Sequence, residues 1–280
     1  MAGDDTLPET NKDYAIGLGR AFGGAIIFAV PLLMTMEMWW LGFSMGRGRL
    51  LLLISVNFAI LVGLSYFAGF EKTFSWKEDV MDALAAFGVG VITSVVMLSL
   101  LAVITFDMTW TESVGKVALQ SVPASIGAIL GRKQLGAEQD IGAEEERKAQ
   151  AGYGGELFLM LAGALFLAFN VAPTEEMILI AYQMSPSHTL ALGAVSIVLL
   201  HVFVYTVGFS GQEGRPEGGT FLSTFLHFTL AGYGISLLIS LYVLWTFGRT
   251  DGVALTEIAN MAVVLGFPAA LGAAVARLVI

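Results

Sequence analysis

Two glutamates lie inside long apolar segments of this chain, at matching places in two copies of one pattern. Residues 24–70 align with residues 163–209 without a gap, and the alignment places Glu37 on Glu176. A charged side chain at the centre of a bilayer costs about 2.5–3.5 kcal/mol on the insertion scale unless it is paired, hydrated or protonated. A pattern that carries this cost in both copies indicates a site that binds cations or protons.

Further oxygen donors lie near the two glutamates. Five residues make up the predicted ion or proton site: Glu37, Glu176, Glu175, Asn57 and Asn170. Pro31 and Pro173 each remove one helix hydrogen bond, which frees a backbone carbonyl close to a glutamate. Because oxygen ligands suit hard cations, we expect no cofactor apart from a bound cation such as Ca²⁺, Mg²⁺, Na⁺ or K⁺.

On continuous helices, both glutamates are expected about 15 Å below the outer membrane surface, since each residue rises 1.5 Å. Asn57 reaches a similar depth on the next, antiparallel helix. His201 lies in the middle of the sixth apolar run and is a candidate proton relay to Glu175 or Glu176, because histidine titrates near neutral pH. The alternative is a histidine that simply hydrogen-bonds a neighbouring helix.

Composition places the chain among polytopic membrane proteins. Hydrophobic residues make up 56% of the 280 residues and charged residues only 13%, with a mean hydropathy of +0.77, whereas soluble domains carry about 25% charged residues. The absence of cysteine excludes disulfides and thiolate metal sites. The net charge of −9 gives no reason to expect nucleic-acid binding.

Eight apolar runs are long enough to cross a bilayer, which takes about 20 residues. The expected spans are 19–45, 50–70, 82–106, 113–131, 155–184, 188–209, 221–247 and 254–277. The predicted fold is all-α and transmembrane, with about eight helices in two parallel four-helix repeats related by a pseudo-twofold axis along the membrane normal. The boundaries are an N-terminal tail 1–18, a first repeat 19–131, a charged linker 132–154 and a second repeat 155–280.

Lysine and arginine predict the orientation of the chain. With the N-terminus in the cytoplasm, ten of these residues fall on the cytoplasmic side and four on the other side. Both termini, the tail and the linker are therefore expected to be cytoplasmic. The charges of the linker indicate either solubility at the membrane surface or regulatory cation binding.

Two arrangements of the glutamates remain open. Glu37 and Glu176 converge inside one chain, or two chains dimerise so that four glutamates ring a pore. Rings of acidic side chains select cations. If the chain forms a homo-oligomer, a dimer is favoured.

Two stretches, NVAPTEE at 170–176 and MEMWWLG at 36–42, resemble a family of uncharacterised bacterial integral membrane proteins. The resemblance covers most of the chain. It implies a multi-pass protein of the bacterial inner membrane and gives no activity.

A second resemblance concerns intramembrane glutamate proteases of the CAAX-processing type. Glu175, Glu176, His201 and His227 lie on three successive spans, as such enzymes require. The arginine expected four residues after the second glutamate is replaced by Ile180, and the residues expected around both histidines are also absent. This activity is therefore the alternative.

The leading hypothesis is a cation channel or cation/proton transporter that uses the intramembrane glutamates. Its partners are the lipid bilayer and inorganic cations or protons. Besides the protease, a third alternative is a membrane scaffold or sensor without transport, in which each glutamate is hydrogen-bonded by its neighbours.

Overall fold

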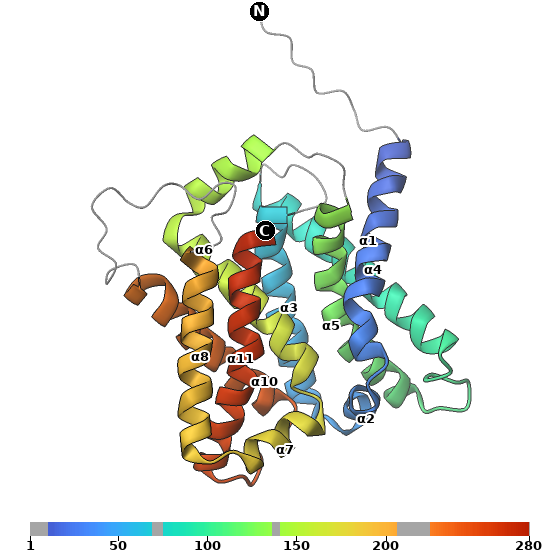
Figure 1. The fold of residues 1–280 in the computed structure, drawn as a ribbon. Coiled ribbons are helices and arrows are strands. Elements are labelled where there is room, and N and C mark those ends of the chain that lie inside the picture. Colours follow the sequence, from blue (N-terminus) through green and yellow to red (C-terminus); the bar gives the residue numbers. More distant parts are fainter. Residues whose placement is uncertain (1–10, 69–74, 136–140, 206–224, 280) are drawn as a thin grey trace, which may run out of the picture.

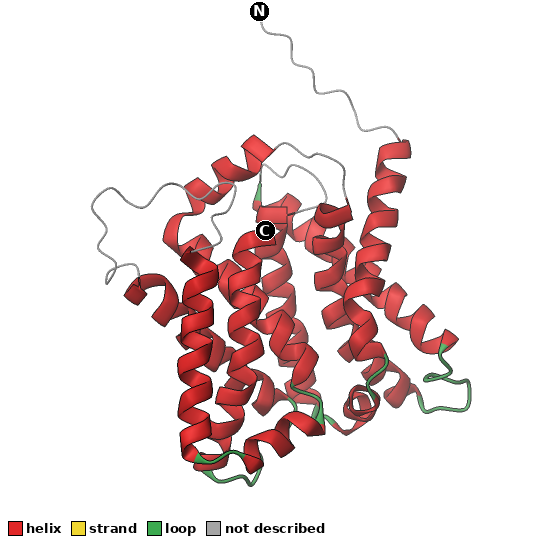
Figure 2. Cartoon of the chain, in the orientation of Figure 1, coloured by secondary structure: helices red, strands yellow, loops and turns green. Residues whose placement is uncertain are grey.

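The computed structural model describes residues 11–68, 75–135, 141–205 and 225–279. Within these ranges the chain forms ten α-helices, one short π-helix and no strand (Figure 2). The helices are α1 (Asn11–Leu33), α2 (Met36–Ser44), α3 (Arg47–Ala68), α4 (Trp76–Leu100), α5 (Trp110–Leu135), α6 (Ile141–Val171), α7 (Glu175–Gln183), α8 (Pro186–Tyr205), η1 (Phe225–Leu230), α10 (Ala231–Thr246) and α11 (Leu255–Val279).

Eight helices among the described residues are long and apolar enough to cross a membrane. A helix is the form that such segments take because it satisfies every backbone group without water. The predicted all-α class and the number of spans are confirmed. Figure 1 shows the start of α1 and the end of α11 at the same end of the bundle, as an even number of crossings requires.

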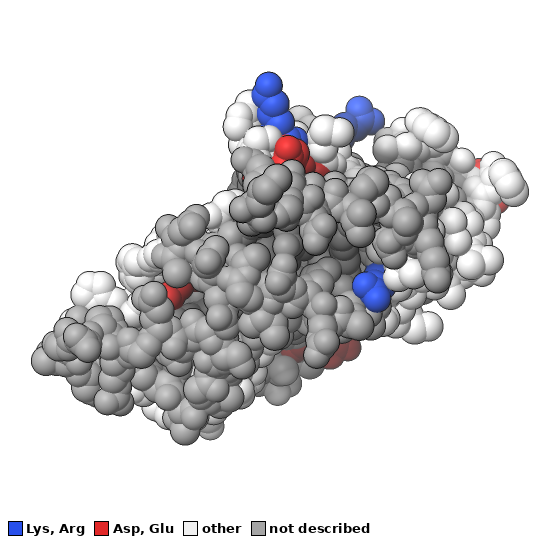
Figure 3. Space-filling model, turned by 90° about the horizontal axis from the view of Figure 1, so that it is seen from above, with Lys and Arg blue, Asp and Glu red and all other residues white. Residues whose placement is uncertain are grey.

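The two ends of the bundle differ. We call the end with the start of α1 and the end of α11 the terminal end, and the opposite end, which carries α2 and α7, the distal end (Figure 1). Viewed from the terminal end, the charged side chains of the described residues stand as separate spots of both signs (Figure 3).

The predicted continuous spans over 19–45 and 155–184 are wrong in their second parts. The first crossing ends at Leu33 and the fifth ends at Val171. The nine-residue helices α2 and α7 follow as separate elements, and Figure 1 shows α2 almost end-on at the distal end, across the direction of the long helices. The apolar composition of α2 and α7 made them resemble continuations of the spans.

Two helices form the centres of the bundle. α5 packs against α1, α2, α3 and α4, whereas α11 packs against α6, α7, α8 and α10. In the crossing part of α5, 83% of the residues are buried, compared with 11% in α8. We call α1–α5 the first half and α6–α11 the second half.

Glycine allows the closest helix crossings. A Cβ atom built on Gly24 of α1 would lie 2.3 Å from the carbonyl oxygen of Gly127 in α5. A Cβ atom on Gly163 of α6 would lie 2.2 Å from the carbonyl oxygen of Gly272 in α11. Small residues of this kind let backbones approach where the hydrophobic effect does not drive helices together.

Two pairs of aromatic side chains join the two halves. The ring of Phe28 packs edge-on against Phe166 with centroids 5.2 Å apart. Phe67 stacks on Phe158 at 6.0 Å. The helix pairs that touch across this boundary include α3 with α6, α3 with α10 and α5 with α6.

The predicted linker 132–154 is partly helical. α5 continues to Leu135 and α6 begins at Ile141. Gly152, with φ 55° and ψ −155°, bends α6 before its membrane-crossing part, because this conformation is open mainly to glycine. Residues 1–10 of the predicted tail lie outside the described residues, and α1 begins at Asn11.

The glycine crossing between α6 and α11 gives a direct prediction. Gly163→Ala should destabilise the protein by about 1–3 kcal/mol, since overpacking forces the two backbones apart. Gly234→Ala is the matched control, because nothing lies within 4 Å of a Cβ at that position in α10. Thermal unfolding in detergent should show a loss for Gly163→Ala alone, and equal behaviour of both variants would contradict the close crossing.

Candidate functional site

The predicted site glutamates lie at the starts of the two short distal helices. Glu37 is in the first turn of α2, and Glu175 and Glu176 are in the first turn of α7. Glu37 is half-buried, whereas Glu175 and Glu176 are exposed. Among the described residues none of the three carboxylates has an ion-pair or side-chain hydrogen-bond partner. The predicted position on continuous spans, about 15 Å below the outer surface, is wrong because the crossings end before these residues.

Local hydrogen bonds hold the break between α1 and α2. Pro31 lies in the last turns of α1, where it cannot donate a backbone hydrogen bond. Thr35 Oγ1 donates to the carbonyl oxygen of Pro31 at 2.6 Å. Trp39 Nε1 donates to the carbonyl oxygen of Leu33 at 2.8 Å. These bonds satisfy carbonyls that the ended helix leaves without partners.

A long-range contact holds the break between α6 and α7. Thr174 Oγ1 donates to the carbonyl oxygen of Val171 at 2.7 Å. Arg249, from the loop between α10 and α11, donates to the carbonyl oxygen of Pro173. The second half thus fixes the start of α7 with a cation from a distant part of the sequence.

One face of each short helix is buried. α2 buries Met38, Leu41 and Gly42, and α7 buries Met177 and Ala181. Gly42 is small enough to lie against the backbone of α5, where an added Cβ would come within 2.7 Å of a lysine. The buried faces hold both helices on the bundle and fix where their first turns lie.

The other two residues of the predicted site, Asn170 and Asn57, lie at different distances from the distal end. Asn170 lies one residue before the end of α6, where its Nδ2 donates to the carbonyl oxygen of Phe166 at 2.7 Å. Asn57 is fully buried, and its Nδ2 donates to Ser125 Oγ of α5 at 3.1 Å. Ten residues separate Asn57 from the start of α3 at Arg47, which corresponds to about 15 Å. Asn57 therefore lies well inside the bundle, while Asn170 lies near the distal break.

His201 lies away from the carboxylates. It stands fifteen residues beyond Pro186, where α8 begins at the distal end (Figure 1), a separation of about 22 Å along the helix. Its Nδ1 is 2.9 Å from Thr229 Oγ1 in η1. The structure does not bring His201 to Glu175 or Glu176, a meeting that both the relay and the protease hypotheses require. Among the described residues no three His, Asp or Glu side chains form a group able to hold a metal ion.

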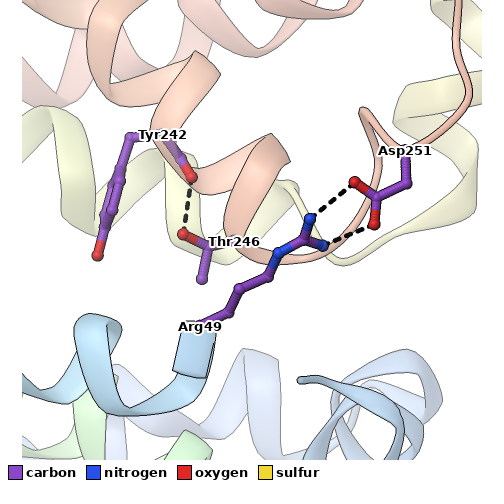
Figure 4. Close-up of polar contacts among 4 residues, drawn as sticks. All are labelled: Arg49, Tyr242, Thr246 and Asp251. Atoms are coloured by element: carbon purple, nitrogen blue, oxygen red, sulfur yellow. Dashed lines mark hydrogen bonds and ion pairs between the residues drawn. The ribbon is translucent and has the colours of Figure 1, made fainter. Parts of the chain in front are cut away.

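An arginine clamp joins the halves at the distal end, and no pattern in the sequence indicates it. Arg49 at the start of α3 makes two hydrogen bonds of 2.7 Å with Asp251, in the loop between α10 and α11 (Figure 4). The same guanidinium lies 4.9 Å from the ring centroid of Trp245. Gly248, with φ 73°, turns this loop and leaves room for the guanidinium, because an added Cβ would be 3.3 Å from it. In the sequence Arg49 and Asp251 are 202 positions apart, and nothing in either segment indicates the other.

A buried lysine closes the neighbouring loop. Lys116 is 7% exposed and forms an ion pair of 2.7 Å with Glu112 in the first turn of α5. Its Nζ also donates to the carbonyl oxygen of Val103, in the loop after α4, at 3.2 Å. These two partners compensate the buried charge of Lys116. Removing either partner would leave the ammonium group only partly compensated in an apolar surrounding, which is destabilising.

Acidic residues outnumber basic ones at the distal end. The acidic side chains there are Glu37, Asp107, Glu112, Glu175, Glu176, Asp251 and Glu257, and the basic ones are Arg47, Arg49, Lys116 and Arg249. Two of the acids are neutralised in ion pairs with Arg49 and Lys116. The remaining acidic side chains outnumber the remaining basic ones, Arg47 and Arg249, so this end carries an excess of acidic groups.

A family model described as "Putative integral membrane protein (DUF2391)" matches residues 17–280. The chain belongs to this family. The match covers nearly all of the chain, both halves included, and confirms the resemblance seen in the NVAPTEE and MEMWWLG stretches. The family description gives membrane integration and no activity. No curated protein and no solved structure matches the chain.

The arginine clamp predicts coupling between two distant residues. Arg49→Ala and Asp251→Ala should each lower the midpoint of thermal unfolding, and the double variant should lose less than the sum, because both remove the same pair. Asp107→Ala is the control, since its carboxyl bonds Thr105 in its own loop. Strictly additive losses would show that the pair does not form.

The clamp also predicts a dependence on pH. The hydrogen bonds from Arg49 hold the pKa of the Asp251 carboxyl below its ordinary value of 3.8. A lowered pKa in the folded state means that the pair stabilises the protein above that ordinary value and stops doing so as the pH falls through the lowered value. Asp251→Asn should remove this part of the acid dependence of unfolding.

Proposed function

We propose that this integral membrane protein is a cation channel or a cation/proton transporter in which Glu37 and Glu176 are the central carboxylates. Glu175 and Asn170 assist them at the distal end, and Asn57 offers an oxygen deeper in the bundle. The observation that carries the proposal is the position of the carboxylates. They stand at two breaks in membrane helices, at one end of the bundle, without ion-pair partners among the described residues.

Electrostatics supports a role as the mouth of a cation pathway. Openings lined by charge of one sign raise the local concentration of counter-ions, and acidic residues of this kind select cations. Acids in the first turn of a helix also complement the helix dipole. That structural role explains one acid at each start, but it does not require the second carboxylate of α7 or the excess of acid at the whole distal end.

A polar group deeper in the bundle supports a continuation of the pathway. The Oδ1 atom of Asn57 is buried and has no hydrogen-bond partner. Leaving such an atom unsatisfied costs about 1–3 kcal/mol. A water molecule or a partly hydrated cation next to Asn57 would remove this cost.

We also propose that the two halves are repeats of one four-helix unit. Helix boundaries support it, because α2 and α7 both contain nine residues and start 139 positions apart, as do α3 and α8. α5 and α11 start 145 positions apart. The crossing of Gly24 with Gly127 also matches that of Gly163 with Gly272 at these two shifts. Two similar halves would give each carboxylate an equivalent setting, as in transporters built from parallel repeats.

Orientation and assembly complete the proposal. The excess of Lys and Arg favours a cytoplasmic position for both termini. In this orientation the acidic distal end would face the outside of a bacterial inner membrane. A homodimer would bring four of the central glutamates to one opening.

The decisive test is cation flux into liposomes that contain the purified protein. Glu37→Gln and Glu176→Gln should each reduce the flux of the transported cation roughly tenfold or more, because they remove the charge that concentrates the ion. K⁺, Na⁺, Ca²⁺, Mg²⁺ and H⁺ are each measured separately.

Glu257→Gln serves as the matched control. Glu257 also lies in the first turn of a distal helix, α11, but it is not one of the central carboxylates. Loss of flux in the two site variants and not in the control supports the proposal. Unchanged flux in both site variants would remove these residues from the mechanism, and a wild-type protein that moves none of these ions would contradict transport.

A further inference from the structure

One face of α6 combines two large side chains with a small one between them. Phe158, Ala162 and Phe166 are spaced four residues apart and therefore lie along one side of the helix. Phe158 stacks on Phe67 of α3, and Phe166 packs against Phe28 of α1. The two aromatic pairs bridge the halves above and below Ala162. The small methyl group between them cannot fill the space that they hold open.

A cavity of about 240 Å³ lies at this place, between the two halves. Its wall is formed by residues from five helices: Leu64 of α3, Ile126 of α5, Ala162 and Phe166 of α6, and Val275 and Ala276 of α11, together with Phe28 of α1. All of these residues lie within the membrane-crossing parts of their helices.

The chemistry of the wall selects the occupant. Among the residues that the structure describes, no polar or charged side chain lines the cavity, and a buried water molecule needs two to four polar partners. An apolar cavity of roughly 150 Å³ in another protein stays dry and binds benzene, so this larger space can hold an aliphatic segment. Water and ions are therefore excluded as occupants.

The cavity is open to its surroundings. Val275 in its wall is 40% exposed, and at this depth of a bilayer the surroundings are acyl chains. An empty space forfeits the dispersion contacts of the atoms that line it. A chain that enters regains these contacts, which are the main source of association energy inside lipid.

We propose that the cavity between the two halves binds the acyl chain of a bilayer phospholipid. The chain fills the gap beside Ala162 and contacts both halves, with the rings of Phe28 and Phe166 in the wall around it. The acyl chain thus fills space at the boundary between the halves. This site is independent of the carboxylates at the distal end.

Photolabelling tests the proposal. The full-length protein is reconstituted with phosphatidylethanolamine that carries a diazirine in the middle of one acyl chain, irradiated, and digested for mass spectrometry. We expect labelling of α6 and α11 residues in the cavity wall, and a several-fold loss of that labelling in Ala162→Phe, whose ring occupies the space. Ala162→Leu is a milder second variant should the first fold poorly, as judged by size-exclusion chromatography.

Ala194→Phe is the matched control, since Ala194 is exposed on α8 and a ring there leaves the cavity free. Wall labelling that persists in Ala194→Phe and falls in Ala162→Phe supports the proposal. Wall labelling that stays unchanged in well-folded Ala162→Phe would overturn it, as would labelling no stronger than that of the exposed surface of α8. Crosslinks from the wall to a second copy of the chain would overturn it in favour of a dimer contact.

Discussion

Every backbone amide and carbonyl at bilayer depth must find a partner within the protein, and this constraint governs the rest of the structure. It requires the crossing segments to be helices, and it makes any break costly unless side chains satisfy the freed groups. The break after α1 uses Thr35 and Trp39 from its own segment. The break after α6 uses Thr174 and, from a distant loop, Arg249. Both breaks fall at the distal end, and the carboxylates of interest follow them directly. The same constraint therefore sets the place where acidic groups meet water.

Packing inside lipid relies on shape because apolar side chains gain little by leaving one apolar surrounding for another. Within each half, glycines bring backbones into direct contact, as between α1 and α5 and between α6 and α11. Between the halves, by contrast, rings of Phe28 and Phe67 meet rings of α6 and leave the space beside Ala162 open. The arginine clamp at the distal end ties this boundary at one edge.

The charged side chains fall into two groups, those in ion pairs and those without an ion-pair partner. Lys116 is paired with Glu112 and Arg49 with Asp251, whereas several distal acids have no ion-pair partner among the described residues. Matched pairs fix loops and the boundary between the halves. Unmatched acids have no structural partner among the described residues, and this makes them the natural candidates for contact with mobile cations. The apolar cavity and the acidic end therefore differ in chemistry, and the two proposals assign them different ligands, a lipid chain and an inorganic ion.

The sequence by itself determined the membrane class, the eight crossings and the family, because long apolar runs leave the backbone no alternative to helices. It also showed a proline within six residues before Glu37 and before Glu176, although it placed both glutamates within continuous spans. Hydrophobicity alone could not reveal that α2 and α7 turn aside, since their residues are as apolar as those of a span. Only the tertiary structure decided the pairing of Arg49 with Asp251, the burial of Asn57 against Ser125 and the separation of His201 from the carboxylates. These depend on contacts between helices far apart in the chain, for which the spacing of residues along the sequence carries no signal.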